Sequence, residues 1–136
     1  MPHNIEKKIA KIRYYLDLLE PYRENCAERF KSDTMFEGAL LHYLYLVSDS
    51  AISLAEMVIK QHKLMRPDSY YEAIDILGQH GLIPRAFAYD FAGIAGFRNF
   101  LAHDYERIDP EYICEVALKK LDEVKQYLAY IEKVVQ

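Results

Sequence analysis

The sequence predicts an all-α fold, an up-down bundle of about four main helices with short helices between them. Three observations support this. Glycine and proline occur only five times each in 136 residues, which leaves little room for the frequent turns of an all-β protein. Apolar residues recur at spacings of three and four along most of the chain. No segment alternates apolar and polar residues with the period of a strand. We therefore expect one helical domain over residues 1–136.

The first expected helix covers about residues 5–19. Its apolar face is formed by Ile5, Ile9, Ile12, Leu16 and Leu19. Pro21 ends it, and a short helical segment follows around residues 24–30. We expect Cys26 in this segment and Cys114 late in the chain to be free thiols, because the two lie far apart and match no metal-binding spacing.

A long helix is expected from about residue 34 to residue 61. Thr34 and Glu37 have the spacing of a capping box, in which the threonine accepts from first-turn amides and the glutamate reaches back. The helix is apolar over more than half its girth, so we expect it to be central or to face a partner. Asp49 and Ser50 interrupt the apolar pattern, and one interpretation is that they are buried polar groups supporting a later helix.

A second capping box, Ser69 with Glu72, opens a short helix that stops at Gly78 or Gly81. Pro84 suits the first position of the next helix. The apolar face of that helix carries Phe87, Phe91, Ile94, Phe97 and Leu101.

The last expected helix begins at Asp109 and Pro110, a capping residue followed by a proline at the first helical position. Its buried side is formed by Ile113, Val116, Ala117, Leu121, Val124, Leu128, Ile131 and Val135. The spacing of apolar residues thus predicts helices along most of the chain.

Composition restricts the possible functions. A net charge of −4 argues against a general nucleic-acid binder, although it is compatible with an enzyme that holds RNA in a local basic cleft. No apolar run approaches the roughly 20 residues that span a bilayer, and no secretory signal opens the chain. We therefore expect a cytoplasmic protein without a membrane partner. Tyrosine occurs 12 times, which fits either a sizeable interface or ordinary helix boundaries.

Metal and cofactor sites are not indicated. No two histidines are four residues apart, and the chain has no Cys/His cluster. Capping, core-edge or terminal positions explain four of the histidines better than a chemical role: His3, His42, His62 and His80. Four cations could add positive potential to a cleft, but a solvated surface is the simpler interpretation for Lys60, Lys63, Arg66 and Arg85.

The strongest functional signal is the segment 98–105, which reads RNFLAHDY. Arginine can hold a phosphate through two parallel hydrogen bonds, and histidine is the side chain best suited to moving a proton near neutral pH. On a helical wheel of about 100° per residue, Arg98, Asn99 and His103 lie beside the apolar stripe and not within it. Arg98 and His103 could also simply complement the dipole at the end of a helix, so the spacing alone leaves both interpretations open.

The pattern R-N-x-x-x-H-x-Y, late in an all-α chain and followed by an amphipathic helix, resembles the signature of HepT-type toxins in the HEPN ribonuclease superfamily. The resemblance implies a metal-independent ribonuclease that acts on RNA as a homodimer, with both motif copies facing one cleft. It also implies that Arg98 and His103 form the catalytic pair, with Asn99 in support.

Proteins of this family are toxins paired with an MNT nucleotidyltransferase antitoxin. The antitoxin is understood to silence the toxin by adenylylating the motif tyrosine, which corresponds here to Tyr105. The resemblance therefore implies an MNT partner and leaves room for larger hetero-oligomers with it. Two other interpretations stay open: a non-catalytic helical subunit that binds a nucleotide or a nucleotidyltransferase partner, and a plain dimeric helical protein without a ligand.

Overall fold

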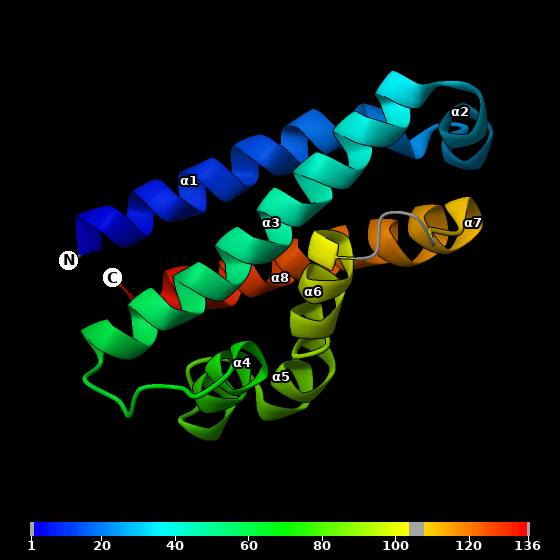
Figure 1. The fold of residues 1–136 in the computed structure, drawn as a ribbon. Helices are drawn as coiled ribbons and strands as arrows, with labels where there is room; N and C mark the ends of the chain where they lie inside the picture. Colours follow the sequence, from blue (N-terminus) through cyan, green and yellow to red (C-terminus); the bar gives the residue numbers. More distant parts are fainter. Residues whose placement is uncertain (1, 104–107, 136) are drawn as a thin grey trace.

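The computed structural model describes residues 2–103 and 108–135, and every regular element within them is helical (Figure 1). In chain order these are α1 (Pro2–Leu19), a 3-10 turn (Glu20–Arg23), α2 (Cys26–Ser32), α3 (Thr34–Gln61), α4 (Tyr70–Gln79), α5 (Arg85–Phe91), α6 (Ile94–His103), α7 (Pro110–Tyr112), a π-helical segment (Ile113–Ala117) and α8 (Leu118–Val134). The predicted all-α fold is confirmed.

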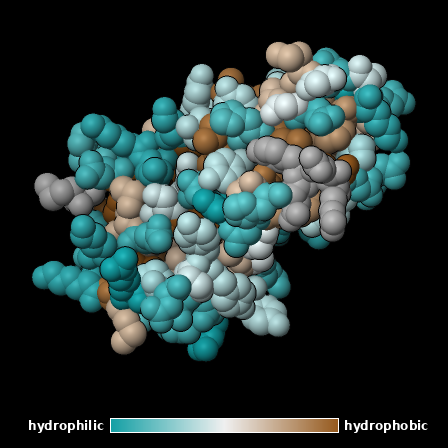
Figure 2. Space-filling view, in the orientation of Figure 1, coloured by the Kyte–Doolittle hydropathy of each residue, from teal (hydrophilic) through white to brown (hydrophobic). Residues whose placement is uncertain are grey.

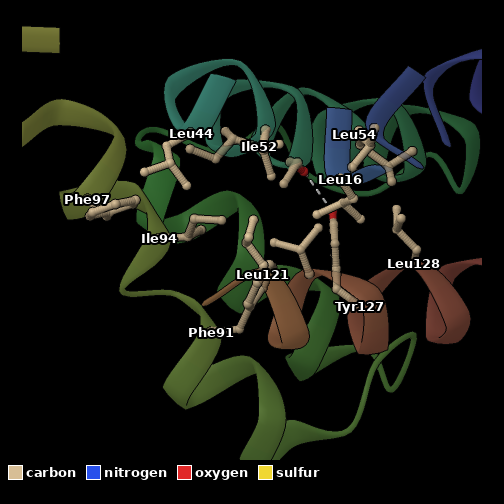
Figure 3. Close-up of a cluster of buried hydrophobic side chains, with 14 of the residues drawn as sticks. Leu16, Leu44, Ile52, Leu54, Phe91, Ile94, Phe97, Leu121, Tyr127 and Leu128 are labelled. Carbon is tan, nitrogen blue, oxygen red and sulfur yellow. Dashed lines mark hydrogen bonds between the residues drawn. The ribbon is translucent and has the colours of Figure 1, made fainter. Parts of the chain in front are cut away.

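The long helices α1, α3 and α8 enclose the main core. Figure 3 shows side chains of all three converging, among them Leu16 of α1, Leu54 of α3 and Leu128 of α8, each no more than 3% exposed. Tyr127 lies in the same cluster and is fully buried, and its hydroxyl donates to the carbonyl oxygen of Ala51 at 2.8 Å. This hydrogen bond satisfies a polar group that would be costly to bury without a partner.

Helices α4 and α6 pack against α3, and α5 packs against α4 (Figure 1). The prediction of one helix from Pro84 to Leu101 was wrong, because α5 ends at Phe91 and α6 starts at Ile94. Gly93 lies at the break, where glycine's low helix propensity makes a change of direction cheap. Apolar periodicity did not reveal the break, since both halves keep their apolar residues toward the core.

The start of α3 differs from the predicted capping box. Asp33, not Thr34, is the capping residue, and its Oδ1 accepts from the amides of Met35 at 3.0 Å and Phe36 at 3.1 Å. Asp33 has an extended backbone, with φ at −133°, whereas Thr34 is already helical. A capping side chain must stand just outside the helix, so the position of the first turn decides between two adjacent candidates.

Two other predicted caps are confirmed. The Ser69 hydroxyl accepts from the amide of Glu72 at 3.0 Å, and Asp109 Oδ1 accepts from the amide of Glu111 at 3.1 Å. Pro84 was predicted to be the first helical residue, but it is the residue just before α5, which begins at Arg85.

A disulfide joins Cys26 of α2 to Cys114 of the π-helical segment, so the prediction of two free thiols was wrong. The residues are 88 positions apart in sequence, but the last helix returns to α2 and places their Cα atoms 5.7 Å apart. That separation lies within the range a disulfide can bridge.

The face of the molecule in Figure 2 carries mainly hydrophilic and intermediate side chains, with hydrophobic ones in small patches. Several large side chains are nevertheless exposed in the described part of the chain, including Tyr14, Met35, Met65 and Tyr89. No helix among the described residues is long and apolar enough to cross a membrane.

Candidate active site

Helix α6 holds the candidate site against the middle of α3. Phe97 and Leu101 point into the core, at 6% and 0% exposure, and anchor the helix (Phe97 is labelled in Figure 3). Arg98 follows Phe97 on the helix, so it emerges beside the buried face, with its side chain 16% exposed. This is the position beside the apolar stripe that the helical wheel predicts.

Three hydrogen bonds fix the guanidinium group of Arg98. Its Nε donates to Asp49 Oδ1, its Nη2 donates to the hydroxyl of Tyr45, and its Nη1 donates to Asn99 Oδ1, each at 3.1 Å. A guanidinium carries five N–H groups. Among the described residues these bonds therefore leave two N–H groups without a partner, one on each terminal nitrogen. Two donors on one guanidinium can bind two oxygens of a phosphate.

Two tyrosine rings flank the same cation. The guanidinium carbon of Arg98 lies 5.2 Å from the ring centroid of Tyr45 and 4.9 Å from that of Tyr70. Burial lowers the pKa of Arg98, but the hydrogen bond with Asp49 and the two nearby tyrosines outweigh burial, so this pKa lies above its usual value. Arg98 therefore stays positively charged and holds a fixed orientation.

His103 is the last residue of α6 and is exposed. Its imidazole makes no hydrogen bond with any residue of 2–103 or 108–135. Asn99, four positions before His103 on the same helix, accepts from Arg98. Tyr105 lies outside the described residues, so its position relative to Arg98 stays a prediction.

The structure adds two residues that the sequence did not single out, Tyr45 and Tyr70. Tyr45 lies one helical turn before Asp49 on α3, and this spacing could have identified it once Asp49 was suspected. Tyr70, the first residue of α4, carries no such signal. Asp49 supports the later helix through its ion pair with Arg98, but its side chain is 45% exposed, so the prediction that it is buried was wrong. The buried serine beside it is Ser48, at 2% exposure, and not Ser50.

A pocket of about 670 Å³ opens next to Arg98. Its walls come from residues 67–71 around the start of α4, from the turn between α5 and α6 together with part of α6, and from Glu56 of α3. Tyr70 and Asn99 line it as well as touching Arg98, so the pocket and the arginine site share two walls.

A family model described as ribonuclease HepT-like matches residues 6–131, nearly the whole chain. The chain belongs to the HepT-like ribonuclease family. The predicted family, and with it the prediction of a ribonuclease, is confirmed.

Two curated relatives of this HepT-like protein are nucleases. The mRNA nuclease HepT of Shewanella oneidensis is 23% identical over 128 residues, which cover 94% of this chain and 96% of that protein. The tRNA nuclease HepT of Aphanizomenon flos-aquae is 27% identical over 135 residues, which cover 98% of this chain and 88% of that protein.

The fold is also that of a solved relative. The tri-AMPylated HEPN toxin of Shewanella oneidensis, solved in complex with its MNT antitoxin, superposes with a TM-score of 0.83. The match covers 95% of this chain and 96% of that one at 22% sequence identity. At this identity the superposition shows the HEPN-type fold alone.

Proposed function

We propose that this HepT-like ribonuclease cleaves RNA without a metal ion, as the toxin of a toxin–antitoxin pair, with Arg98 and His103 as its catalytic residues. The observation that carries the proposal is the fixed guanidinium of Arg98, which keeps one N–H group on each terminal nitrogen for a ligand. The nuclease activities named for the relatives from Shewanella oneidensis and Aphanizomenon flos-aquae support RNA as the substrate.

In the proposed reaction Arg98 holds the scissile phosphate. Attack on phosphorus adds negative charge to the phosphate oxygens, and the two N–H groups of Arg98 stabilise that charge. His103 takes the proton from the ribose 2′-hydroxyl as general base, or gives a proton to the leaving oxygen as general acid. Asn99 keeps Arg98 in place through the hydrogen bond to Nη1.

Base and acid are both required in one cleavage, and a single histidine cannot serve as both at once. We therefore propose a homodimer in which two copies of the motif face one cleft and contribute one His103 each. The exposure of His103 at the end of α6 is compatible with this arrangement. Sedimentation of the purified protein as a monomer under assay conditions would contradict it.

The proposed partner is an MNT nucleotidyltransferase that silences the protein by adenylylating Tyr105. The AMPylated state of the Shewanella oneidensis toxin in its complex with MNT supports this regulation. Tyr105 follows Arg98 by seven positions in the sequence, and an added phosphate would compete for the same guanidinium. Intact mass after incubation with the antitoxin and ATP should rise by one or more AMP groups, and Tyr105→Phe should abolish the increase at that site.

Cleavage of RNA in EDTA is the direct test of the nuclease. His103→Ala and Arg98→Ala should each lower the cleavage rate by about 100-fold or more. His80→Ala, an exposed histidine at the end of α4, is the matched control and should cleave at the parental rate. Parental cleavage by His103→Ala would refute the assignment. An inactive parent that binds tightly to a nucleotidyltransferase would favour the alternative, a non-catalytic helical subunit of that complex.

A further inference from the structure

The pocket beside Arg98 has the features of a base-binding site, an inference that rests on the proposed ribonuclease function. Tyr70 lines the pocket while its ring lies 4.9 Å from the guanidinium carbon of Arg98. Asn99 also lines the pocket and accepts from Arg98 at 3.1 Å. A nucleotide whose phosphate sits on Arg98 therefore has its nucleoside next to the mouth of the pocket.

The pocket offers aromatic surface to a flat ligand. Tyr70 is 37% exposed and Tyr71 is 49% exposed, so both side chains keep surface that a ligand can cover. The lining on α6 includes Gly96, where an added Cβ would meet no atom within 4 Å, so the pocket is open there. Nucleobases commonly stack on exposed aromatic side chains of this kind.

The polar edge of the pocket carries acceptors. Glu56 and Asp68 line it, and within residues 2–103 and 108–135 no ion pair engages either carboxylate. Two carboxylates repel a phosphate, so this space does not suit a second phosphate group. They suit a ligand that presents N–H donors.

Among the four RNA bases, guanine best meets a carboxylate. Its Watson–Crick edge presents two adjacent donors, N1–H and the N2 amino group, which can both reach one carboxylate. Adenine and cytosine place an unprotonated ring nitrogen beside their amino group, and uracil places its one N–H between two carbonyl groups, so each brings an acceptor against the carboxylate oxygens. We propose that the pocket binds a guanine base of the RNA, adjacent to the phosphate held by Arg98, with Tyr71 stacking on the base and Glu56 accepting from its edge.

Direct binding of mononucleotides to the full-length protein tests the site without relying on cleavage. GMP should bind about tenfold or more tightly than UMP in calorimetric titrations, since a two-donor contact discriminates to that extent. Glu56→Gln should remove most of this preference, and Tyr71→Ala should weaken GMP binding about fivefold or more. Two surface variants are matched controls and should bind GMP as the parent does: Glu28→Gln on α2 and Tyr89→Ala on α5, whose ring is 75% exposed.

Cleavage of short RNAs that differ at one base supplies the second readout. The parent should cut the guanine-containing RNA fastest, and Glu56→Gln should equalise the rates. Equal rates for all four RNAs in a parent whose cleavage still requires His103 would overturn the base site and leave the nuclease intact. GMP binding with the stated dependence, in a protein that cuts no RNA, would support the base site and refute the nuclease. A Tyr71→Ala variant with altered sedimentation and unaltered GMP affinity would mark the pocket as a protein interface and overturn the proposal.

Discussion

Asp49 Oδ1 accepts a hydrogen bond from Arg98 Nε at 3.1 Å, across 49 positions of sequence and between α3 and α6. The bond occupies the nitrogen nearest the side-chain stem and leaves donors on the two terminal nitrogens for a ligand. The ion pair therefore orients the arginine as well as joining two helices.

Replacing Asp49 with alanine should impair RNA cleavage more than stability. The carboxylate is 45% exposed, and pairs of this kind contribute at most about 1 kcal/mol to the free energy of unfolding. Loss of the orientation of Arg98 should lower kcat/KM by about 10- to 100-fold. Asp122→Ala removes a comparable ion pair, with Arg23 and remote from the site, and serves as control. Equal rates for the Asp49 and Asp122 variants would show that Asp49 does not position Arg98.

The sequence predicted the candidate site residues that lie on α6, but it did not predict Tyr45 and Tyr70. Arg98, Asn99 and His103 lie close together in the chain, so one helix determines their mutual placement. Tyr45 and Tyr70 belong to other helices, and their contact with Arg98 depends on how α3, α4 and α6 pack. Apolar periodicity reveals which face of a helix is buried, but it does not reveal which helix covers that face.

The difference between local signals and helix packing also explains why the disulfide was missed. The helix starts at Ser69 and Asp109 followed from local chemistry, because a capping side chain acts within one turn. Local chemistry did not locate the start of α3, where Asp33 is the cap in place of Thr34, or the break between α5 and α6. The disulfide between Cys26 and Cys114 could not be predicted in this way, since only the return of the last helix to α2 brings the two sulfur atoms together.

The disulfide should contribute measurably to stability. Closing a chain segment of 88 residues restricts the unfolded state, and loss of such a bond is expected to cost about 2–4 kcal/mol. Thermal unfolding should therefore occur at a lower temperature after reduction. A Cys26→Ala/Cys114→Ala variant should unfold at the same temperature with and without reductant. Alkylation of two thiols in unreduced, denatured protein would contradict the presence of the bond.

Stability should fall at high pH because of Tyr127. Complete burial raises the pKa of the Tyr127 hydroxyl, while in the unfolded chain it keeps the ordinary value of about 10. Both states are protonated below pH 10, so the contribution of this group is fully present there. Above about pH 10 only the unfolded state loses the proton, and the free energy of unfolding decreases by up to about 1.4 kcal/mol per pH unit.

Urea denaturation at pH 8, 10 and 11 measures this decrease. Tyr127→Phe lacks the titrating group but also the hydrogen bond to Ala51, so at pH 8 it should be about 1 kcal/mol less stable than the parent. That deficit should shrink as the pH rises to 11. Tyr89→Phe, with an exposed ring, should follow the parent at every pH. Parallel curves for the parent and Tyr127→Phe would refute the role of Tyr127.

Two glycines should respond in opposite ways to alanine. A Cβ on Gly78 would lie 2.5 Å from the Cβ of Ala88, where α4 and α5 pack, so Gly78→Ala should force these helices apart and cost about 1–3 kcal/mol. Gly38 lies inside α3 with no atom within 4 Å of an added Cβ, so Gly38→Ala should stabilise the protein by up to about 1 kcal/mol. Adding Ala88→Gly to Gly78→Ala removes the opposing methyl group, and it should recover part of the lost stability in urea denaturation. If the second substitution recovers nothing, close approach of α4 and α5 is not the reason for a glycine at position 78.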